Sequence, residues 1–513
     1  MKRYSDLEFL KLSKGQKFLY KLTSFFAAIP RAIGNLFLAI GRFFKNLGLG
    51  VANEFKDIFT TFKEGDWKTR ASFLVMGLGS IARGQVLRGL LFLLFEIVFI
   101  FYMVTTGGYW MSMLPSLGKI GPHDEYNAVL DAYTKTYGDN SFKILLYGVL
   151  TIFFIVAFLY TWRMNVKQNK IAQEYLKAGR RLKSSGDDLR SLVDEQFYKT
   201  LLALPLTGIL IFTVLPIVFM ILVAFTNYDG THDGYNNALF GWQGFSNFRT
   251  LLTWSGSGVN YSATFGEILT WTLIWAFFAT FTNYFLGMFV AMMINKKGIR
   301  LKKLWRTILV MTIAIPQFIS LLYVSKMFAK NGIVNGLLLD LGWIKQAIDF
   351  WGSTANNGLL PRVMVIVINI WIGIPYLMLI ATGILMNIPA DLYESSRIDG
   401  ANAWQQYTKI TLPYMLFITG PYLLTSFTSN MNNFNVIYLL TGGAPTNAAA
   451  SGAAGSVGYT DLLITWLFKI TTGAEAQYYL ASVVGIMVFV VVAVISLVVY
   501  NVLPSIKNEE DFQ

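Results

Sequence analysis

Long apolar runs separated by short polar stretches dominate this chain. Eight runs have about 20 mostly apolar residues or more, which is the length that an α-helix needs to cross a lipid bilayer. The eight runs lie at residues 86–107, 143–163, 200–225, 268–294, 305–327, 362–387, 413–440 and 478–503. The pattern therefore predicts an all-α integral membrane protein with eight transmembrane helices.

Composition supports this assignment and excludes several kinds of functional site. Charged residues make up 14% of the 513 residues, whereas soluble domains carry about 25%. The chain has no cysteine, so disulfides, cysteine metal sites and cysteine nucleophiles are excluded. The net charge of +13 is typical of basic cytoplasmic loops. A nucleic-acid partner is not expected, because no basic module interleaved with aromatic residues is present.

Charge in the loops predicts the orientation of the helices. Residues 163–199 and 296–306 are rich in Lys and Arg, and the alternate loops are poor in both. Positive loops mark the cytoplasmic side of a membrane protein. Eight helices with both termini in the cytoplasm agree with every loop. The outer loops are then 108–142, 226–265, 328–361 and 441–477.

The first 85 residues follow a different pattern. Residues 17–47 mix Lys and Arg with Phe, Leu and Ile, which is typical of a basic amphipathic helix on the anionic inner leaflet. Pro30 is expected to kink or divide that helix. The apolar stretch 71–81 is too short to cross the membrane alone. We predict four regions: 1–85 at the membrane surface, 86–199 with two helices, a six-helix core at 200–503, and a cytoplasmic tail at 504–513.

A polar stretch between the sixth and seventh predicted helices interrupts the apolar pattern. Residues 391–399 can form a short helix, with Asp391 as its cap and Glu394 completing a capping box. Gly400 can end this helix in a left-handed turn. A second short helix is expected at 401–411, and Pro413 can open the next membrane helix.

The spacing of this stretch resembles the "EAA" loop of ABC-importer permeases. The chain reads E-S-S-x-x-x-G-A and then, after eight residues, I-x-L-P. In that family the loop docks into a cleft of an ATPase subunit and transmits its closure to the membrane helices. The resemblance therefore implies a coupling loop at residues 389–413, in which Ser replaces the family's Ala twice and keeps the side chains small. The eight corresponding positions are Glu394, Ser395, Ser396, Gly400, Ala401, Ile410, Leu412 and Pro413.

A wider resemblance covers roughly residues 200–503. The segments AFTNY, GFSNF, WIGIPY, IPADLYESS and GYTDLL look like those of MalF-type permeases of maltose and maltodextrin importers, which have a MetI-like core. The resemblance implies a second, MalG-like permease, two MalK- or MsmK-like ATPase subunits, an extracellular sugar-binding protein and an oligosaccharide substrate. The outer loop 226–265 lacks room for the large domain of the enterobacterial type. A plasma membrane of a Gram-positive bacterium is therefore the expected location.

Polar side chains recur on one face of the seventh predicted helix. Tyr422, Ser426, Ser429, Asn430 and Asn433 fall at helical spacing. Such groups avoid lipid and face either a polar cavity or another helix. The residues alone leave both possibilities open. The resemblance favours sugar contact for Ser426, Ser429, Asn430 and Asn433.

The sixth predicted helix contains a Gly-Ile-Pro sequence. Pro375 cannot donate a hydrogen bond to the Trp371 carbonyl, so we expect the helix to open there. Gly373 would allow another group to approach closely. The resemblance places Ile372, Gly373 and Tyr376 at the sugar site, and the alternative is a simple kink.

Several functions lack their sequence signatures. The chain has no P-loop motif, so ATP hydrolysis is expected from partner ATPases, which use ATP and Mg²⁺. We expect no cofactor, no metal and no enzymatic activity in the chain itself. The alternatives are an importer of galactan- or raffinose-type oligosaccharides, an ion-coupled secondary transporter, and a membrane-surface scaffold. A secondary transporter usually buries ionisable groups near the midplane, and the last six helices carry few.

Overall fold

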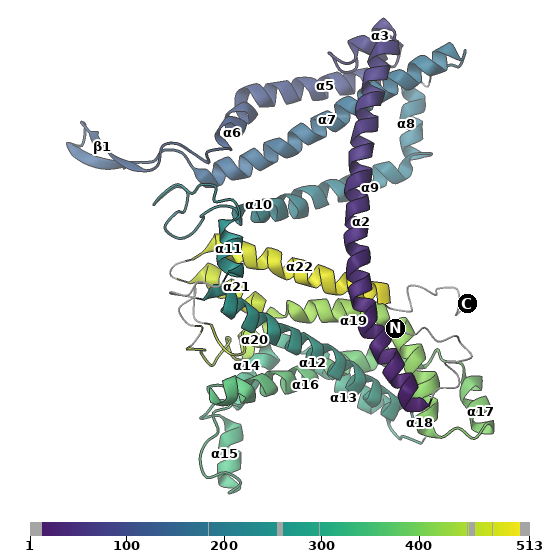
Figure 1. Ribbon diagram of the computed structural model, residues 1–513, viewed down its shortest axis with the longest axis vertical. Helices are drawn as coiled ribbons and strands as arrows, with labels where there is room; N and C mark the ends of the chain where they lie inside the picture. Colours follow the sequence, from purple (N-terminus) through teal and green to yellow (C-terminus); the bar gives the residue numbers. More distant parts are fainter. Residues whose placement is uncertain are drawn as a thin grey trace. The chain divides into compact units, whose positions relative to one another are not determined.

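The computed structural model describes residues 13–182, 184–253, 260–296, 298–448, 450, 457–473 and 476–502. These residues fold mainly into α-helices and separate into two compact units (Figure 1). One unit comprises residues 39–247 and 477–482, and the other comprises residues 1–38, 248–476 and 483–513. The predicted tail 504–513 lies outside the described residues. The four predicted regions stay a prediction.

The first unit contains the following elements of the N-terminal half, in chain order. They are α3 (Trp67–Ala71), α4 (Leu78–Ile81), α5 (Val86–Tyr102), η1 (Met103–Gly107), α6 (Gly108–Met113), β1 (His123–Asn127), β2 (Ala132–Thr136), α7 (Ser141–Lys177), α8 (Ser185–Val193), α9 (Phe197–Ile209), η2 (Leu210–Val214) and α10 (Leu215–Val223), where η marks a π-helical turn. Strands β1 and β2 form an antiparallel hairpin in a loop that was predicted to be an outer one, and the all-α prediction did not include it.

The second unit contains the C-terminal half. Its elements are α12 (Tyr261–Asn295), α13 (Lys302–Ala314), α14 (Gln317–Met327), α15 (Ile333–Asp340), α16 (Ala355–Leu385), α17 (Ala390–Ile398), α18 (Ala403–Gln406), η3 (Tyr407–Thr411), α19 (Leu412–Met431), α20 (Phe434–Leu440) and α21 (Leu463–Thr472). Helices α2 (Lys14–Glu64), α11 (Ser246–Leu252) and α22 (Tyr478–Val502) contain residues of both units.

Seven helices within the described residues are long and apolar enough to cross a membrane. They are Val86–Met113, Ser141–Lys177, Phe197–Val223, Tyr261–Asn295, Ala355–Leu385, Ala403–Met431 and Tyr478–Tyr500. The pair α13 and α14 makes an eighth crossing only if both are counted together, because they bend by 90°. With that pair counted as one crossing, the structure agrees with the predicted eight membrane helices.

Two of the predicted membrane helices are broken. The run 305–327 divides at Ile315 and Pro316, where the backbone becomes extended and Pro316 precedes α14. Proline disfavours helical backbone in the residue before it, so the helix turns sharply at this point, by 90°. The run 413–440 divides after Met431, and Asn433 instead caps α20 by accepting the Val436 N–H at 3.3 Å. The predicted helical face therefore does not extend to Asn433.

Other predicted interruptions are missing. Helix α2 continues through Pro30, so of the two predicted effects, a kink or a division, the division is wrong. Helix α16 continues through Pro375, and its non-helical backbone lies at residues 356–358 instead. The expected opening at Pro375 is therefore also wrong. A proline removes one hydrogen bond, and packing of the flanking turns can hold the helix together across that gap.

Two π-turns lie just before prolines in membrane helices and make room for the proline rings. The turn η2 ends two residues before Pro216, and η3 ends two residues before Pro413. A π-turn widens the backbone by one residue, and this gives room for a ring that would otherwise clash with the preceding turn. As a result the helix that contains Pro413 already begins at Ala403, ten residues before the predicted start.

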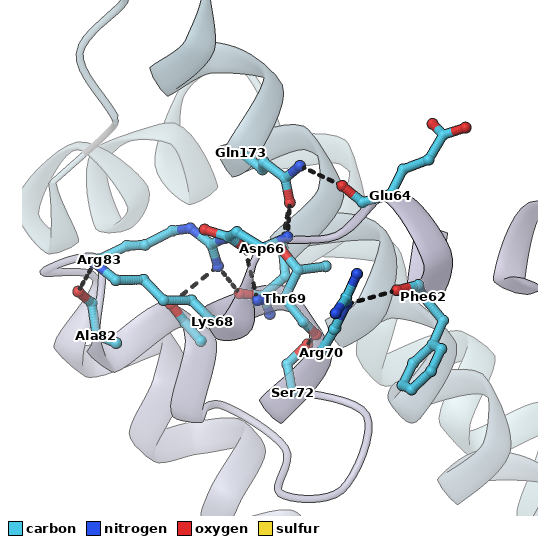
Figure 2. Close-up of polar contacts among 12 residues, drawn as sticks. Phe62, Glu64, Asp66, Lys68, Thr69, Arg70, Ser72, Ala82, Arg83 and Gln173 are labelled. Carbon is cyan, nitrogen blue, oxygen red and sulfur yellow. Dashed lines mark hydrogen bonds and ion pairs between the residues drawn. The ribbon is translucent and has the colours of Figure 1, made fainter. Parts of the chain in front are cut away.

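Residues 65–85 fold back against α7 as the short helices α3 and α4, and they form no spanning helix. Figure 2 shows the polar network that holds them. The Arg83 guanidinium is fully buried and contacts the Asp66 carboxylate at 2.5 Å. The Gln173 carbonyl oxygen accepts hydrogen bonds from the Asp66 N–H and the Thr69 hydroxyl, both 2.9 Å. Burial opposes ionisation of Asp66, but hydrogen bonds from Thr69 and Arg83 keep its pKa below the usual value.

Residues 65–85 also explain why an acidic residue, Glu96, lies in the first predicted membrane helix. Glu96 of α5 is buried, and its carboxylate accepts the Met76 backbone N–H at 2.8 Å. Gly77 and Gly89 meet so closely that a Cβ on Gly77 would lie 1.9 Å from the Gly89 carbonyl oxygen. Glu96 thus stabilises the folded segment that precedes its own helix.

Helix α12 is the centre of the second unit. It packs along α16 and α19, and Trp275 and Ala279 are buried in an apolar cluster with Val365 and Ile368 of α16. Tyr284 of α12 donates to or accepts from the Thr419 hydroxyl of α19 at 2.8 Å. These contacts fix α16 and α19, the two helices that carry the predicted sugar-contact residues.

Candidate functional site

The polar stretch after α16 forms two short helices joined by a turn. Helix α17 ends at Ile398, and Gly400 adopts φ +77°, as predicted for a left-handed turn. The predicted capping box at Asp391 and Glu394 is wrong, because α17 begins after Pro389 and has no side-chain cap. The capping box lies instead on the next helix.

The second short helix begins with that capping box. The Gln405 N–H donates to the Asn402 side chain at 2.8 Å, and the Asn402 N–H donates to the Gln405 side chain at 2.9 Å. The helix passes through η3 into α19 without a break, so it does not stop at residue 411 as predicted. A movement of this end would therefore act directly on a membrane helix.

Three hydrogen bonds hold α17 against the second helix. The Gln406 amide donates to the Ser396 hydroxyl at 2.8 Å and to the Tyr393 carbonyl at 3.2 Å. The Tyr393 and Thr411 hydroxyls lie 2.8 Å apart. Ser396, one of the predicted coupling residues, therefore stabilises the loop from within. Sequence reasoning missed Tyr393 and Gln406, although both lie in the polar stretch.

The remaining predicted coupling residues lie mostly on the outside of this unit. Glu394, Ser395 and Gly400 are exposed, as is Pro413, whereas Ala401, Ile410 and Leu412 are partly buried. Two large apolar side chains, Ile398 and Trp404, are 87% and 70% exposed beside them. An acid next to bare apolar side chains on a rigid loop is suited to contact with another protein.

A separate cavity lies at the break between α13 and α14. It has a volume of about 260 Å³, and its lining residues are Thr312, Ile313, Ile315, Pro316, Gln317, Ser320, Trp371, Ile372 and Tyr376. The structure thus brings two predicted sugar-contact residues, Ile372 and Tyr376, to one cavity. Gln317 and Ser320 were not predicted as lining residues. The sequence feature that could have indicated them is Pro316, which breaks the helix.

Gly373 lies on a different side of α16 from this cavity. A Cβ at Gly373 would meet the Asn283 side chain of α12 at 2.5 Å. The expected close approach at this glycine is therefore present, and its partner is the neighbouring helix.

The polar stripe of α19 is divided between two environments. Ser429 is exposed and Ser426 is partly buried. The Asn430 amide donates to the Thr280 hydroxyl of α12 at 3.0 Å and its oxygen accepts from Asn433 at 3.3 Å. The lining residues of the cavity do not include the stripe. Asn430 thus shows the helix–helix contact that was one of the two open alternatives.

Comparison with known proteins identifies the family. Residues 283–508 match the family described as binding-protein-dependent transport system inner membrane component. The maltodextrin transport system permease protein MalC of Streptococcus pneumoniae is 31% identical over 444 residues, which cover 85% of this chain and 96% of MalC. The galactooligosaccharides transport system permease protein GanP of Bacillus subtilis is 31% identical over 440 residues, which cover 85% of this chain and 97% of GanP.

The similarity to the MalF type is confirmed over a shorter length. The maltose/maltodextrin transport system permease protein MalF of Escherichia coli strain K12 is 33% identical over 258 residues, or 50% of this chain and 48% of MalF. The long matches, the MetI-like family match and the membrane helices agree with one another. The chain therefore belongs to the family of binding-protein-dependent transport system inner membrane components, the membrane permeases of ABC importers.

Proposed function

We propose that the chain is the MalF-type permease subunit of an importer for maltose and maltodextrin. The observation that carries the proposal is the 31% identity over 96% of the maltodextrin permease MalC. The cavity beside Trp371 and Tyr376 supports it, because aromatic side chains with a few polar neighbours suit the apolar faces and hydroxyls of a sugar ring.

In this proposal a partner ATPase supplies the energy. Two MalK- or MsmK-like subunits would bind ATP and Mg²⁺, and the chain would need no cofactor of its own. One subunit would hold the coupling loop through Glu394, Ile398 and Trp404. Because the second helix of the loop continues into α19, closure of the ATPase dimer would move the polar stripe of α19 and alternate access to the sugar.

The remaining subunits complete the pathway. A second, MalG-like permease would supply the other half of the channel, and an extracellular binding protein would deliver the sugar. Both termini would lie in the cytoplasm of a Gram-positive cell, with the chain in its plasma membrane. The short outer loop between α10 and α12 is the basis for that assignment.

One transport experiment tests this function. The chain is reconstituted in proteoliposomes with its permease, ATPase and binding-protein partners, and uptake of labelled maltotriose is measured with proton and sodium gradients collapsed. We expect ATP-dependent uptake that survives the loss of both gradients. Uptake that needs an ion gradient and ignores ATP would contradict the proposal and favour a secondary transporter.

A second substrate class is supported by one specific observation. The similarity to GanP nearly equals that to MalC in both identity and coverage. Galactooligosaccharides are therefore the alternative substrate of the same machinery. Competition of labelled maltotriose uptake by unlabelled galactotetraose separates the two: strong competition together with weak maltotriose uptake would assign the chain to galactooligosaccharides.

A further inference from the structure

A second pocket of the C-terminal unit lies apart from the cavity described above. It has a volume of about 470 Å³ and is lined by Gly266, Glu267, Thr270, Trp271, Ile274, Asn357, Arg362, Asn447 and Tyr459. These residues come from the first turns of α12 and α16 and from the segment after α20. All three places adjoin or belong to loops that the charge pattern predicts to be extracellular.

Polar groups of opposite charge meet in this pocket. The Arg362 guanidinium lies 3.8 Å from the Glu267 carboxylate. The Asn447 amide donates to both Glu267 oxygens, at 3.2 and 3.1 Å. The charges of Glu267 and Arg362 cancel each other. The pocket therefore offers many hydrogen-bonding groups without net charge. Such a lining suits a neutral polar ligand better than an anion or a cation.

Two aromatic side chains complete the lining. The Arg362 guanidinium lies 4.8 Å from the Trp271 ring and 5.7 Å from the Tyr459 ring. Its Nε also donates to the Tyr459 carbonyl at 2.7 Å. Arg362 therefore joins α16 to α12 and to the later segment, and the rings are held in place without a ligand.

The backbone at the rim of the pocket is held in an uncommon conformation. Asn356, Asn357 and Gly358 have φ values of 50°, 58° and 67° in succession. Left-handed backbone is unfavourable for most residues other than glycine, although asparagine adopts it more readily than most. The Tyr459 Cβ packs against Gly358, where an added Cβ would lie only 2.6 Å away. This arrangement sets the exposed Asn357 at the wall of the pocket.

We propose that this pocket is an entrance subsite for a neutral oligosaccharide. Aromatic rings, paired amides and a neutralised acid–base pair match a ligand of sugar hydroxyls and ring faces. The proposal rests on the proposed sugar-import function. Arg362 and Tyr376 are 14 positions apart on one helix, which is about 21 Å along its axis at ~1.5 Å per residue. Only a long oligosaccharide could contact both sites, so the subsite would favour longer substrates.

Site-directed labelling tests the proposal directly, because the chain has no cysteine of its own. Thr270→Cys places a single thiol in the pocket, and Lys345→Cys places one on an exposed position between α15 and α16 as the control. Intact cells that produce the chain with its importer partners are treated with a membrane-impermeant maleimide, with maltoheptaose or an equal concentration of mannitol.

We expect Thr270→Cys to be labelled from outside and maltoheptaose to slow its labelling about threefold to tenfold, the effect of roughly 1 kcal/mol. Mannitol should have no effect, and Lys345→Cys should react equally fast in both sugars. Labelling of Thr270→Cys that maltoheptaose leaves unchanged would overturn the proposal. Failure of Thr270→Cys to react in intact cells would overturn it as well, because an entrance subsite must be open to the outside.

A matched pair of glycine substitutions then tests the role of Asn357. Asn357→Gly removes the amide from the pocket and relieves the left-handed backbone, whereas Asn356→Gly relieves the same strain outside the lining. We expect Asn357→Gly to raise the apparent KM for maltoheptaose about threefold to tenfold, with little change for maltose. Equal effects of the two substitutions would contradict a ligand contact by Asn357.

The two proposals fail in different ways. If ATP-driven maltotriose uptake is present but maltoheptaose gives no protection, the entrance subsite is wrong and the proposed function stands. If no maltodextrin is transported, the proposed function is wrong whatever the labelling shows.

Discussion

The Gln406 amide and the Ser396 hydroxyl lie 2.8 Å apart, and their hydrogen bond joins the two short helices of the proposed coupling loop. Gly400 turns the chain between them. Because the second helix runs on into α19, this bond fixes the position of α17 relative to a membrane helix. A force applied to α17 can then reach α19 without being lost in the turn.

Breaking this contact should weaken the transmission of force. We expect Gln406→Ala to lower ATP-dependent uptake several-fold while the chain still inserts and assembles, since one or two hydrogen bonds of about 1 kcal/mol each are lost. Uptake and ATP hydrolysis are measured in proteoliposomes. Lys409→Ala in the same turn is exposed and serves as the control. Normal uptake by Gln406→Ala would show that the loop is rigid without this bond.

Glu394 tests the contact between the loop and the ATPase. We expect Glu394→Lys to abolish uptake and to leave ATP hydrolysis uncoupled from it, because a docked acid would be replaced by a repelling base. The matched control is Asp391→Lys, an exposed acid one turn earlier on α17. An equal loss in both variants would indicate a general effect of charge, and normal uptake by Glu394→Lys would contradict docking.

Asn430 distinguishes sugar contact from helix packing. We expect Asn430→Leu to raise the apparent KM for maltotriose about tenfold, the effect of roughly 1.4 kcal/mol. Thr280→Val removes only the partner of Asn430 on α12 and should change the KM little. Both variants are assayed for uptake and for thermal unfolding in detergent. If they lose stability equally and keep the same KM, Asn430 acts only in packing.

Asp57 makes the attachment of α2 to α7 sensitive to acid. Hydrogen bonds from Lys170 and Arg163, at 2.7 and 2.5 Å, hold the pKa of Asp57 below its usual value of 3.8. A lowered pKa in the folded state contributes stability that is present above the unfolded pKa and is lost as the pH falls through the folded pKa. The attachment should therefore weaken only below about pH 4.

Hydrogen exchange checks this attachment. We expect amides of α2 near residues 50–60 to exchange faster in Asp57→Asn than in the unchanged chain at neutral pH, and this difference to shrink below pH 4. Lys56→Ala, next to Asp57 on the same helix, is the control. Identical exchange in Asp57→Asn and the unchanged chain at neutral pH would show that other contacts hold α2.

The membrane helices could be predicted because twenty apolar residues have few alternatives to crossing a bilayer. The breaks within them could not. Whether a helix continues past Pro316 or Pro375 depends on neighbours that replace the missing hydrogen bond, and the local sequence does not contain them. Likewise Asn433 fits a helical spacing, but its side chain is better satisfied as the cap of α20.

The proposed coupling loop gives a second example of structure that the local sequence does not determine. Asp391 with Glu394 and Asn402 with Gln405 both match the spacing of a capping box. Only the second pair forms one, because Pro389 fixes an extended backbone immediately before α17 and places Asp391 inside the helix. Gly400 was predictable because few residues other than glycine tolerate φ +77°. The cavity at Pro316 could not be predicted from the sequence, because its two walls come from helices about 55 residues apart in sequence.

Gly373 and Gly383 provide a matched test of how tightly α12 packs on α16. A Cβ at Gly373 would lie 2.5 Å from the Asn283 side chain, whereas one at Gly383 on the same helix meets nothing within 4 Å. Overpacking of this kind costs about 1–3 kcal/mol, and alanine is favoured over glycine in a helix by about 1 kcal/mol. We expect Gly373→Ala to lower the thermal unfolding temperature in detergent and to reduce uptake, and Gly383→Ala to do neither. Asn283→Ala in the Gly373→Ala background should restore stability by making room for the new methyl group. If Gly373→Ala is as stable as Gly383→Ala, the two helices are less closely packed than the structure shows.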